Sequence, residues 1–150
     1  MSDLKMYNDQ LDALIANLSP ASRRNMAAEI AKKLRATQQQ NIKAQHGPDG
    51  KPFVARKKLP TRGKKGRIKR AMFTKLRTAR YLKAKGTSNE ATVEFTGNVQ
   101  RMARVHHYGL RDRPSKKTGG TDVRYEKRPL LGVNKKEKES IEKIYLEFLS

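Results

Sequence analysis

Residues 51–85 read KPFVARKKLPTRGKKGRIKRAMFTKLRTARYLKAK, and this stretch divides the chain into two parts of different character. It contains fifteen Lys or Arg and no Asp or Glu, so most of the formal net charge of +21 lies here. Two helical patterns precede the stretch, and strand patterns with a last helical pattern follow it. This order predicts an α+β fold whose helical part and small antiparallel sheet are joined by a long basic loop.

The stretch itself has two halves. Residues 56–66 are broken by Pro60, Gly63 and Gly66 and are almost purely basic, which predicts a mobile loop over about residues 54–67. Apolar residues at helical spacing follow and predict a short amphipathic helix. They are Ile68, Met72, Phe73 and Leu76.

Working outward toward the N-terminus, apolar residues recur every three or four positions over residues 3–18. This periodicity predicts a helix that packs on the core or contacts another subunit. Ser19 and Pro20 suit the start of a second helix that extends to about Gln45. The short connection predicts an antiparallel helical hairpin. Residues 37–41 are polar all round, and we expect them to project from the core or meet another chain.

Working outward toward the C-terminus, alternation over residues 80–85 and 91–96 predicts a β-hairpin. A short helix is expected over residues 99–106, and a second mobile loop over about residues 111–121. Val123 and Tyr125 predict a short strand. The last helix is expected over residues 135–149, capped by Asn134, with Glu137 reaching back in a capping box. We expect this helix, like residues 3–18, to carry part of a subunit contact.

Composition limits what the chain can be. A length of 150 residues predicts a single domain over residues 1–150. Leu, Ile, Val and Phe total 29 residues, about 19% of the chain, near the ~20% below which highly charged chains tend to be disordered. The core is therefore thin, and we expect partners to order part of the chain. No apolar run approaches the ~20 residues of a membrane span, so no membrane association is expected.

The sequence shows no catalytic, metal or cofactor motif. Cysteine is absent, and the acidic residues are scattered. The run Gly63–Gly66 has the wrong spacing for a phosphate-binding loop, and His106 and His107 are adjacent, so their side chains should point apart. We therefore expect a protein that is not an enzyme and that binds no cofactor and no metal.

The basic stretch is open to three interpretations: a solvated loop, a surface for an acidic protein partner, or a nucleic-acid grip that neutralises phosphates without reading sequence. Composition alone ranks nucleic acid first. The residues expected to face DNA or an acidic partner are Arg56, Lys57, Lys58, Arg62, Lys64, Lys65 and Arg67.

Five motifs in order change that ranking. They are MAAEIAKKL at 26–34, GPDG at 47–50, GRIKRAMF at 66–73 with KLR at 75–77, VHHYG at 105–109, and RPLLG at 128–132. Together they resemble the phage virion morphogenesis family over nearly the whole chain. The resemblance implies a structural tail protein that finishes the tail and makes it competent to join the DNA-filled head. No catalytic residue is implied.

The resemblance also implies a location and partners. The protein is expected in the virion tail near the head–tail junction, and in the host bacterial cytoplasm during assembly, with other tail and neck proteins as partners. A weaker similarity to neck and tail-completion proteins of other tailed phages implies a homo-oligomeric ring, with sixfold order, through which packaged DNA would pass. The alternative function is non-sequence-specific nucleic-acid binding through residues 51–85.

A further set of residues is expected to form an assembly interface or part of the core, close together around the terminal helix. This set is His106, Tyr108, Arg128, Leu130 and Leu131.

Overall fold

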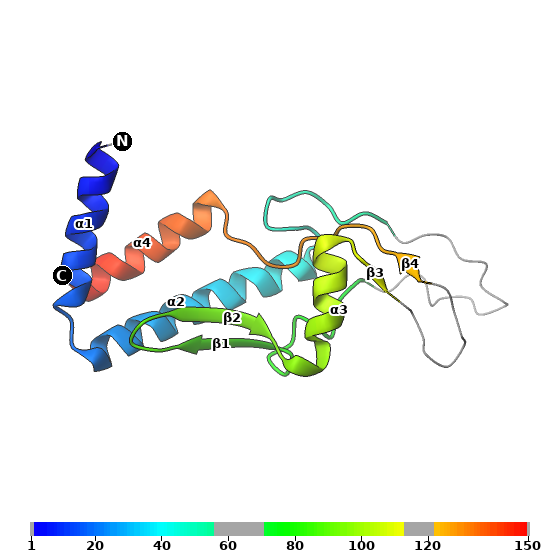
Figure 1. Cartoon of the computed structure of the whole chain (residues 1–150), viewed down its shortest axis with the longest axis horizontal. Coiled ribbons are helices and arrows are strands. Elements are labelled where there is room, and N and C mark those ends of the chain that lie inside the picture. Colours follow the sequence, from blue (N-terminus) through cyan, green and yellow to red (C-terminus); the bar gives the residue numbers. More distant parts are fainter. Residues whose placement is uncertain (1, 56–70, 113–121, 150) are drawn as a thin grey trace.

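The computed structural model describes residues 2–55, 71–112 and 122–149, which form four helices and two small antiparallel sheets (Figure 1). The predicted α+β class is confirmed. In chain order the elements are α1 (Ser2–Ala16), α2 (Pro20–Lys43), β1 (Leu82–Gly86), β2 (Ala91–Phe95), α3 (Gly97–Tyr108), β3 (Arg111–Asp112), β4 (Val123–Arg124) and α4 (Lys135–Leu149).

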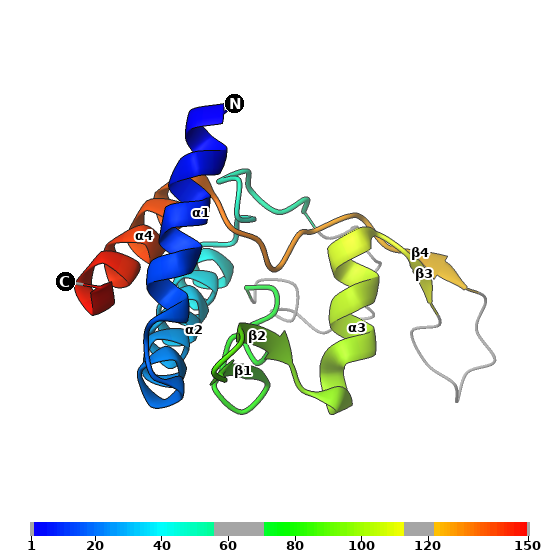
Figure 2. The same cartoon turned by 60° about the vertical axis from the view of Figure 1, so that its left-hand side comes forward.

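Helix α2 is the centre of the fold. The Ser19 hydroxyl accepts a hydrogen bond from the backbone N–H of Ser22 at 3.1 Å, and Pro20 occupies the first turn, as the sequence predicts. The β1–β2 hairpin and α4 cover different sides of α2 (Figure 2). Its buried apolar residues are Met26, Ala27, Ile30, Ala31 and Ile42.

The β1–β2 hairpin, also predicted, packs one face on α2. The register pairs Leu82 with Phe95 and Ala84 with Val93, and these residues share the inward face, whereas Lys83 on the other face is exposed. The main hydrophobic cluster forms where this face meets the end of α2, α3 and the segment before α4. It consists of Ile42, Leu76, Leu82, Phe95, Ala103 and Leu130.

The N-terminal helices do not form the packed hairpin that the sequence suggested. Helix α1 leaves the start of α2 and makes no extensive contact with another described element (Figures 1 and 2). The reason is that the apolar stripe of α2 is already covered by the β1–β2 hairpin and α4. The stripe of α1 therefore finds no face of α2 to bury against.

The helix predicted over residues 68–76 is wrong in its described part. Residues 72–77 form successive turns, while residues 68–70 lie outside the described chain. Phe73 has φ 63°, a left-handed conformation that a right-handed helix cannot contain. The predicted apolar face was nonetheless meaningful, because Leu76 is buried in the core.

Two smaller expectations also need correction. Arg111 and Asp112, placed in a mobile loop, form a strand that pairs with β4. The polar stretch of α2 does not project into solvent, because Gln38 and Asn41 are buried. Among the described residues, no helix is both long and apolar enough to cross a bilayer.

Gly86 gives the hairpin a testable requirement. A Cβ atom at this position would collide with the backbone nitrogen of Ala28 and lie 2.7 Å from its Cα atom. Because α2 backbone cannot move aside cheaply, we expect Gly86→Ala to lower the free energy of unfolding by about 1–3 kcal/mol in denaturant titration. Gly97→Ala is the matched control, since nothing lies within 4 Å of its Cβ position. Equal stability of the two variants would contradict this packing.

Candidate functional site

The described residue ranges meet at a segment that has no regular secondary structure. We call residues 125–134, which connect β4 to α4, the strap. The strap passes the C-terminal end of α3 and the residues that precede positions 56–70, which we call the basic segment (Figure 1). A segment without helix or strand pairing must satisfy its backbone polar groups in other ways. The side chains that do so define the site.

Arg128 attaches the strap to the start of the basic segment. Its side chain is 6% exposed, and its guanidinium donates to the carbonyl oxygens of Val54 at 2.8 Å and Ala55 at 3.2 Å. Its backbone N–H donates to the carbonyl of His106 at 2.8 Å. The two charge-assisted guanidinium bonds fix the backbone of Val54 and Ala55, the last residues described before the gap at 56–70.

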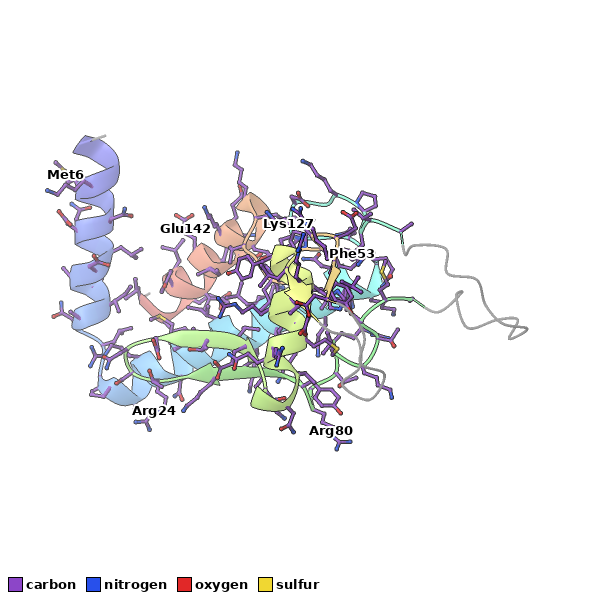
Figure 3. All side chains as sticks on the ribbon, turned by 45° about the vertical axis from the view of Figure 1, so that its right-hand side comes forward. Met6, Arg24, Phe53, Arg80, Lys127 and Glu142 are labelled. Carbon is purple, nitrogen blue, oxygen red and sulfur yellow. The ribbon has the colours of Figure 1, made fainter. Side chains whose placement is uncertain are left out.

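Aromatic contacts and the Gln45 side chain fix Met72 and Phe73, which follow the basic segment. Phe53 meets Phe73 edge-on with 5.5 Å between ring centroids, and Phe73 meets His106 at 5.0 Å. The Gln45 side chain donates to the carbonyl of Met72 at 2.8 Å and accepts from its N–H at 2.7 Å. Figure 3 labels Phe53 at this end of the molecule. Both ends of the basic segment are therefore held on one structured base.

His107 and Gln38 satisfy the strap backbone. His107 Nδ1 accepts from the N–H of Leu130 at 3.0 Å, with the N–H of Leu131 at 3.5 Å. The Gln38 amide donates to the carbonyl of Gly132 at 2.8 Å and accepts from its N–H at 3.2 Å. The latter pair reproduces the two bonds that a strand would supply. The strap is thereby fixed to both α3 and α2.

Glu137 extends this network into α4. Asn134 caps the helix as predicted, since its side-chain oxygen accepts from the N–H of Glu137 at 2.8 Å. The Glu137 carboxylate in turn interacts with the backbone N–H of Asn134, which is the contact back to the cap that the predicted capping box requires. It is 4% exposed and accepts from Gln38 Nε2 at 3.3 Å. Burial raises the pKa of Glu137, and hydrogen bonds from Asn134, Gln38 and Asn41 oppose that effect.

Burial lowers the pKa of both histidines. For His106 the nearby Arg128 charge adds to desolvation, and for His107 the Lys127 charge does. His106 lies between Phe73 and Tyr125, its ring 4.8 Å from that of Tyr125, whereas His107 faces the strap. The expectation that the two side chains point apart therefore matches their placement.

A groove lies between β2, α3 and the strap. Its volume is about 640 Å³, and its lining mixes an apolar floor with a polar rim. The apolar lining comes from Val93, Phe95, Ala103 and Leu131, and the polar lining from Glu94, Gln100, Arg104, His107 and Tyr108. Among described residues, no group of three His, Cys, Asp or Glu side chains is placed to hold a metal ion.

The residues expected at an interface or core are placed as follows. Arg128 and Leu130 are buried, with Leu130 1% exposed in the core, while His106 and Leu131 are partly buried. Tyr108 is 60% exposed on the groove rim. These residues gather around α3 and the strap rather than around α4, and their role in assembly stays a prediction. The residues expected to face DNA or an acidic partner, Arg56, Lys57, Lys58, Arg62, Lys64, Lys65 and Arg67, lie outside the described chain.

Sequence reasoning missed Gln38, Gln45 and the acceptor role of His107. One available signal was the amide-rich run of residues 37–41, which continues a helix whose preceding turns are apolar. A polar run in such a helix also fits burial against a backbone that needs hydrogen bonds.

Comparison with known proteins agrees with the motif order. A model of the phage virion morphogenesis family matches residues 2–150. The chain is 41% identical over 150 residues to the tail completion protein S of Escherichia phage P2, with 99% of each chain covered. No solved structure gives a significant match.

The burial of His107 predicts that the stability of the protein depends on pH. The folded-state pKa of this histidine is lowered, so the unfolded chain binds protons first as pH falls through about 6.5. The free energy of unfolding, measured in denaturant titrations, should therefore decrease as the pH is lowered from about 7.5 to 5.5. His107→Asn offers an acceptor oxygen near the Nδ1 position but does not titrate, so its decrease should be shallower. Glu137 acts in the opposite sense, and comparing the two proteins cancels its contribution. Identical slopes would contradict the assignment.

Proposed function

Because the chain belongs to the phage virion morphogenesis family, we propose that it is a structural subunit that completes a phage tail and joins it to the head. The observation that carries this proposal is the full-length similarity to a tail completion protein. The protein belongs to the virion tail, where it interacts with other tail proteins. The proposal assigns it no catalytic step.

The structure supports the proposal because three of the motifs that carry the family resemblance contact one another in space. The turn at residues 47–50 contacts the strap: a Cβ atom at Gly132 would lie 2.8 Å from Pro48 Cγ, and Asn134 donates to the Pro48 carbonyl at 3.1 Å. Gly109, at φ 69°, would bring a Cβ atom 2.9 Å from the backbone nitrogen of Lys127. The motifs at 47–50, 105–109 and 128–132 therefore build one junction.

The finer proposal is a homo-oligomeric ring with sixfold order near the head–tail junction, in contact with tail and neck proteins. Two features of the described chain support assembly with neighbours. The hydrophobic cluster is small, and several large apolar side chains are exposed. Such surfaces on a small protein often mark protein contacts.

Inactivating the gene in its phage tests the main proposal. We expect DNA-filled heads and separate tails in electron micrographs, and joined particles when wild-type protein is supplied from a plasmid. Gold-labelled protein should lie at the head-proximal end of the tail, and averaged images should show its symmetry. The Gly97→Ala protein serves as a supplied control that should restore joining. Head-attached tails in the absence of the protein would contradict the proposal.

We also propose that the ring places residues 56–67 against packaged DNA without reading its sequence. Changing Lys57, Lys58, Lys64 and Lys65 to Glu should weaken duplex DNA binding. The slope of log affinity against log salt should fall by ~0.9 per lost phosphate contact. The matched control changes four exposed lysines on α4 to Glu. They are Lys135, Lys136, Lys138 and Lys143. Equal losses in both variants, or no loss in either, would refute a specific DNA-facing role.

A further inference from the structure

Helix α1 has an apolar stripe that its own chain leaves largely uncovered. Leu14 is 50% exposed and Met6 is 59% exposed, while Leu11, Ile15 and Leu18 are only partly buried. Figure 3 shows Met6 far from the body of the molecule. A 15-residue helix is marginal in water without tertiary packing. The stripe therefore calls for a partner surface.

The charge of α1 identifies the chemistry of that surface. The helix carries three Asp and one Lys, within a chain whose net charge is +21. Asp12 lies beside the stripe, because it follows Leu11 by one residue and precedes Ile15 by three. A complementary surface would be apolar with a positive charge at its rim. The remainder of this same chain is strongly positive and is a natural source of it.

The groove between β2, α3 and the strap has those properties. Val93, Phe95, Ala103 and Leu131 give it an apolar floor. Arg104 stands at the rim and is exposed, and Glu94 is the acidic residue in the lining. An amphipathic helix in an apolar groove is a common mode of recognition.

A chain cannot fill its own groove with its own α1. The helix and the groove-forming α3 lie toward opposite ends of the long axis of the molecule (Figure 1). Only Asn17, Leu18 and Ser19 connect α1 to α2, and three residues span at most roughly 11 Å. The occupant must therefore come from outside the chain.

We propose that α1 of one copy docks its apolar stripe in the groove between β2 and α3 of the next copy, with Asp12 facing Arg104. The contact is head-to-tail, so it repeats and closes when the rotation between copies permits a ring. This inference rests on the proposed oligomeric function and names the contact that would build it.

Cysteine cross-linking tests the contact, because the chain contains no native cysteine. Asn8 and Asp12 are both exposed and lie one helical turn apart, as do Gln100 and Arg104, and Arg104 and Tyr108. When Asp12 meets Arg104, Asn8 falls near Gln100 or near Tyr108, depending on helix direction. Asn8→Cys chains mixed with Gln100→Cys or with Tyr108→Cys chains should give a mixed disulfide in one of the two pairings. Lys83→Cys, exposed on the hairpin, is the control partner and should give none.

Charge reversal provides the second measurement. Asp12→Arg and Arg104→Glu should each weaken self-association of the full chain roughly tenfold or more, and mixing the two variants should restore it. Glu29→Arg and Arg24→Glu reverse exposed charges elsewhere and should leave association unchanged. Light scattering gives the mass, and cross-linking is repeated in tails isolated from infected cells.

The outcomes separate this inference from the proposed function. Tails that contain the protein but show neither mixed disulfide overturn the α1 contact and leave the tail role standing. A disulfide from Asn8→Cys solely to a different tail protein also overturns it, because the occupant would then not be a second copy. Joined, complete tails without the protein would overturn the proposed function itself.

Discussion

The strap has no hydrogen-bonding ladder of its own, and the fold depends on how its backbone is satisfied. Its N–H and C=O groups pass through a partly buried junction, where each unmade hydrogen bond costs about 1–3 kcal/mol. His107 and Gln38 supply those bonds from two different helices. Arg128, a residue of the strap, binds the carbonyl groups of Val54 and Ala55 just before the basic segment. One irregular segment therefore connects α2, α3, α4 and residues 54–55.

Local patterns in the sequence were sufficient for α2, the β1–β2 hairpin and α4, because caps and periodicity act within a few residues. They failed where a distant partner decides the outcome. Gln38 is buried because it hydrogen-bonds to Gly132 and Glu137, and the amide-rich run around it does not identify those distant partners. Phe73 leaves helical geometry, and its ring meets those of Phe53 and His106 edge-on. For the site, the sequence indicated Arg128 and the histidines, but their partners depend on tertiary contacts.

The balance of charge and apolar area explains why this chain suits an assembly. At a net charge of +21 the positive side chains repel one another, and among the described residues the main hydrophobic cluster contains six buried side chains. Apolar surface that the chain cannot bury internally, on α1 and along the groove, can be buried between molecules. Positive charge is tolerable when a polyanion or an acidic surface lies nearby.

The spacing of these contacts along the chain also sets an order of events during synthesis. Gln38 is separated in sequence from its partners Gly132 and Glu137 by 94 and 99 residues. Val54 is separated from Arg128 by 74 residues. None of these bonds exists until nearly all of the polypeptide has left the ribosome. A chain truncated before the strap cannot close the junction, because it lacks the partners of Gln38 and Val54. Incomplete products therefore lack the finished groove, because its lining includes the strap residues Leu131 and Gly132.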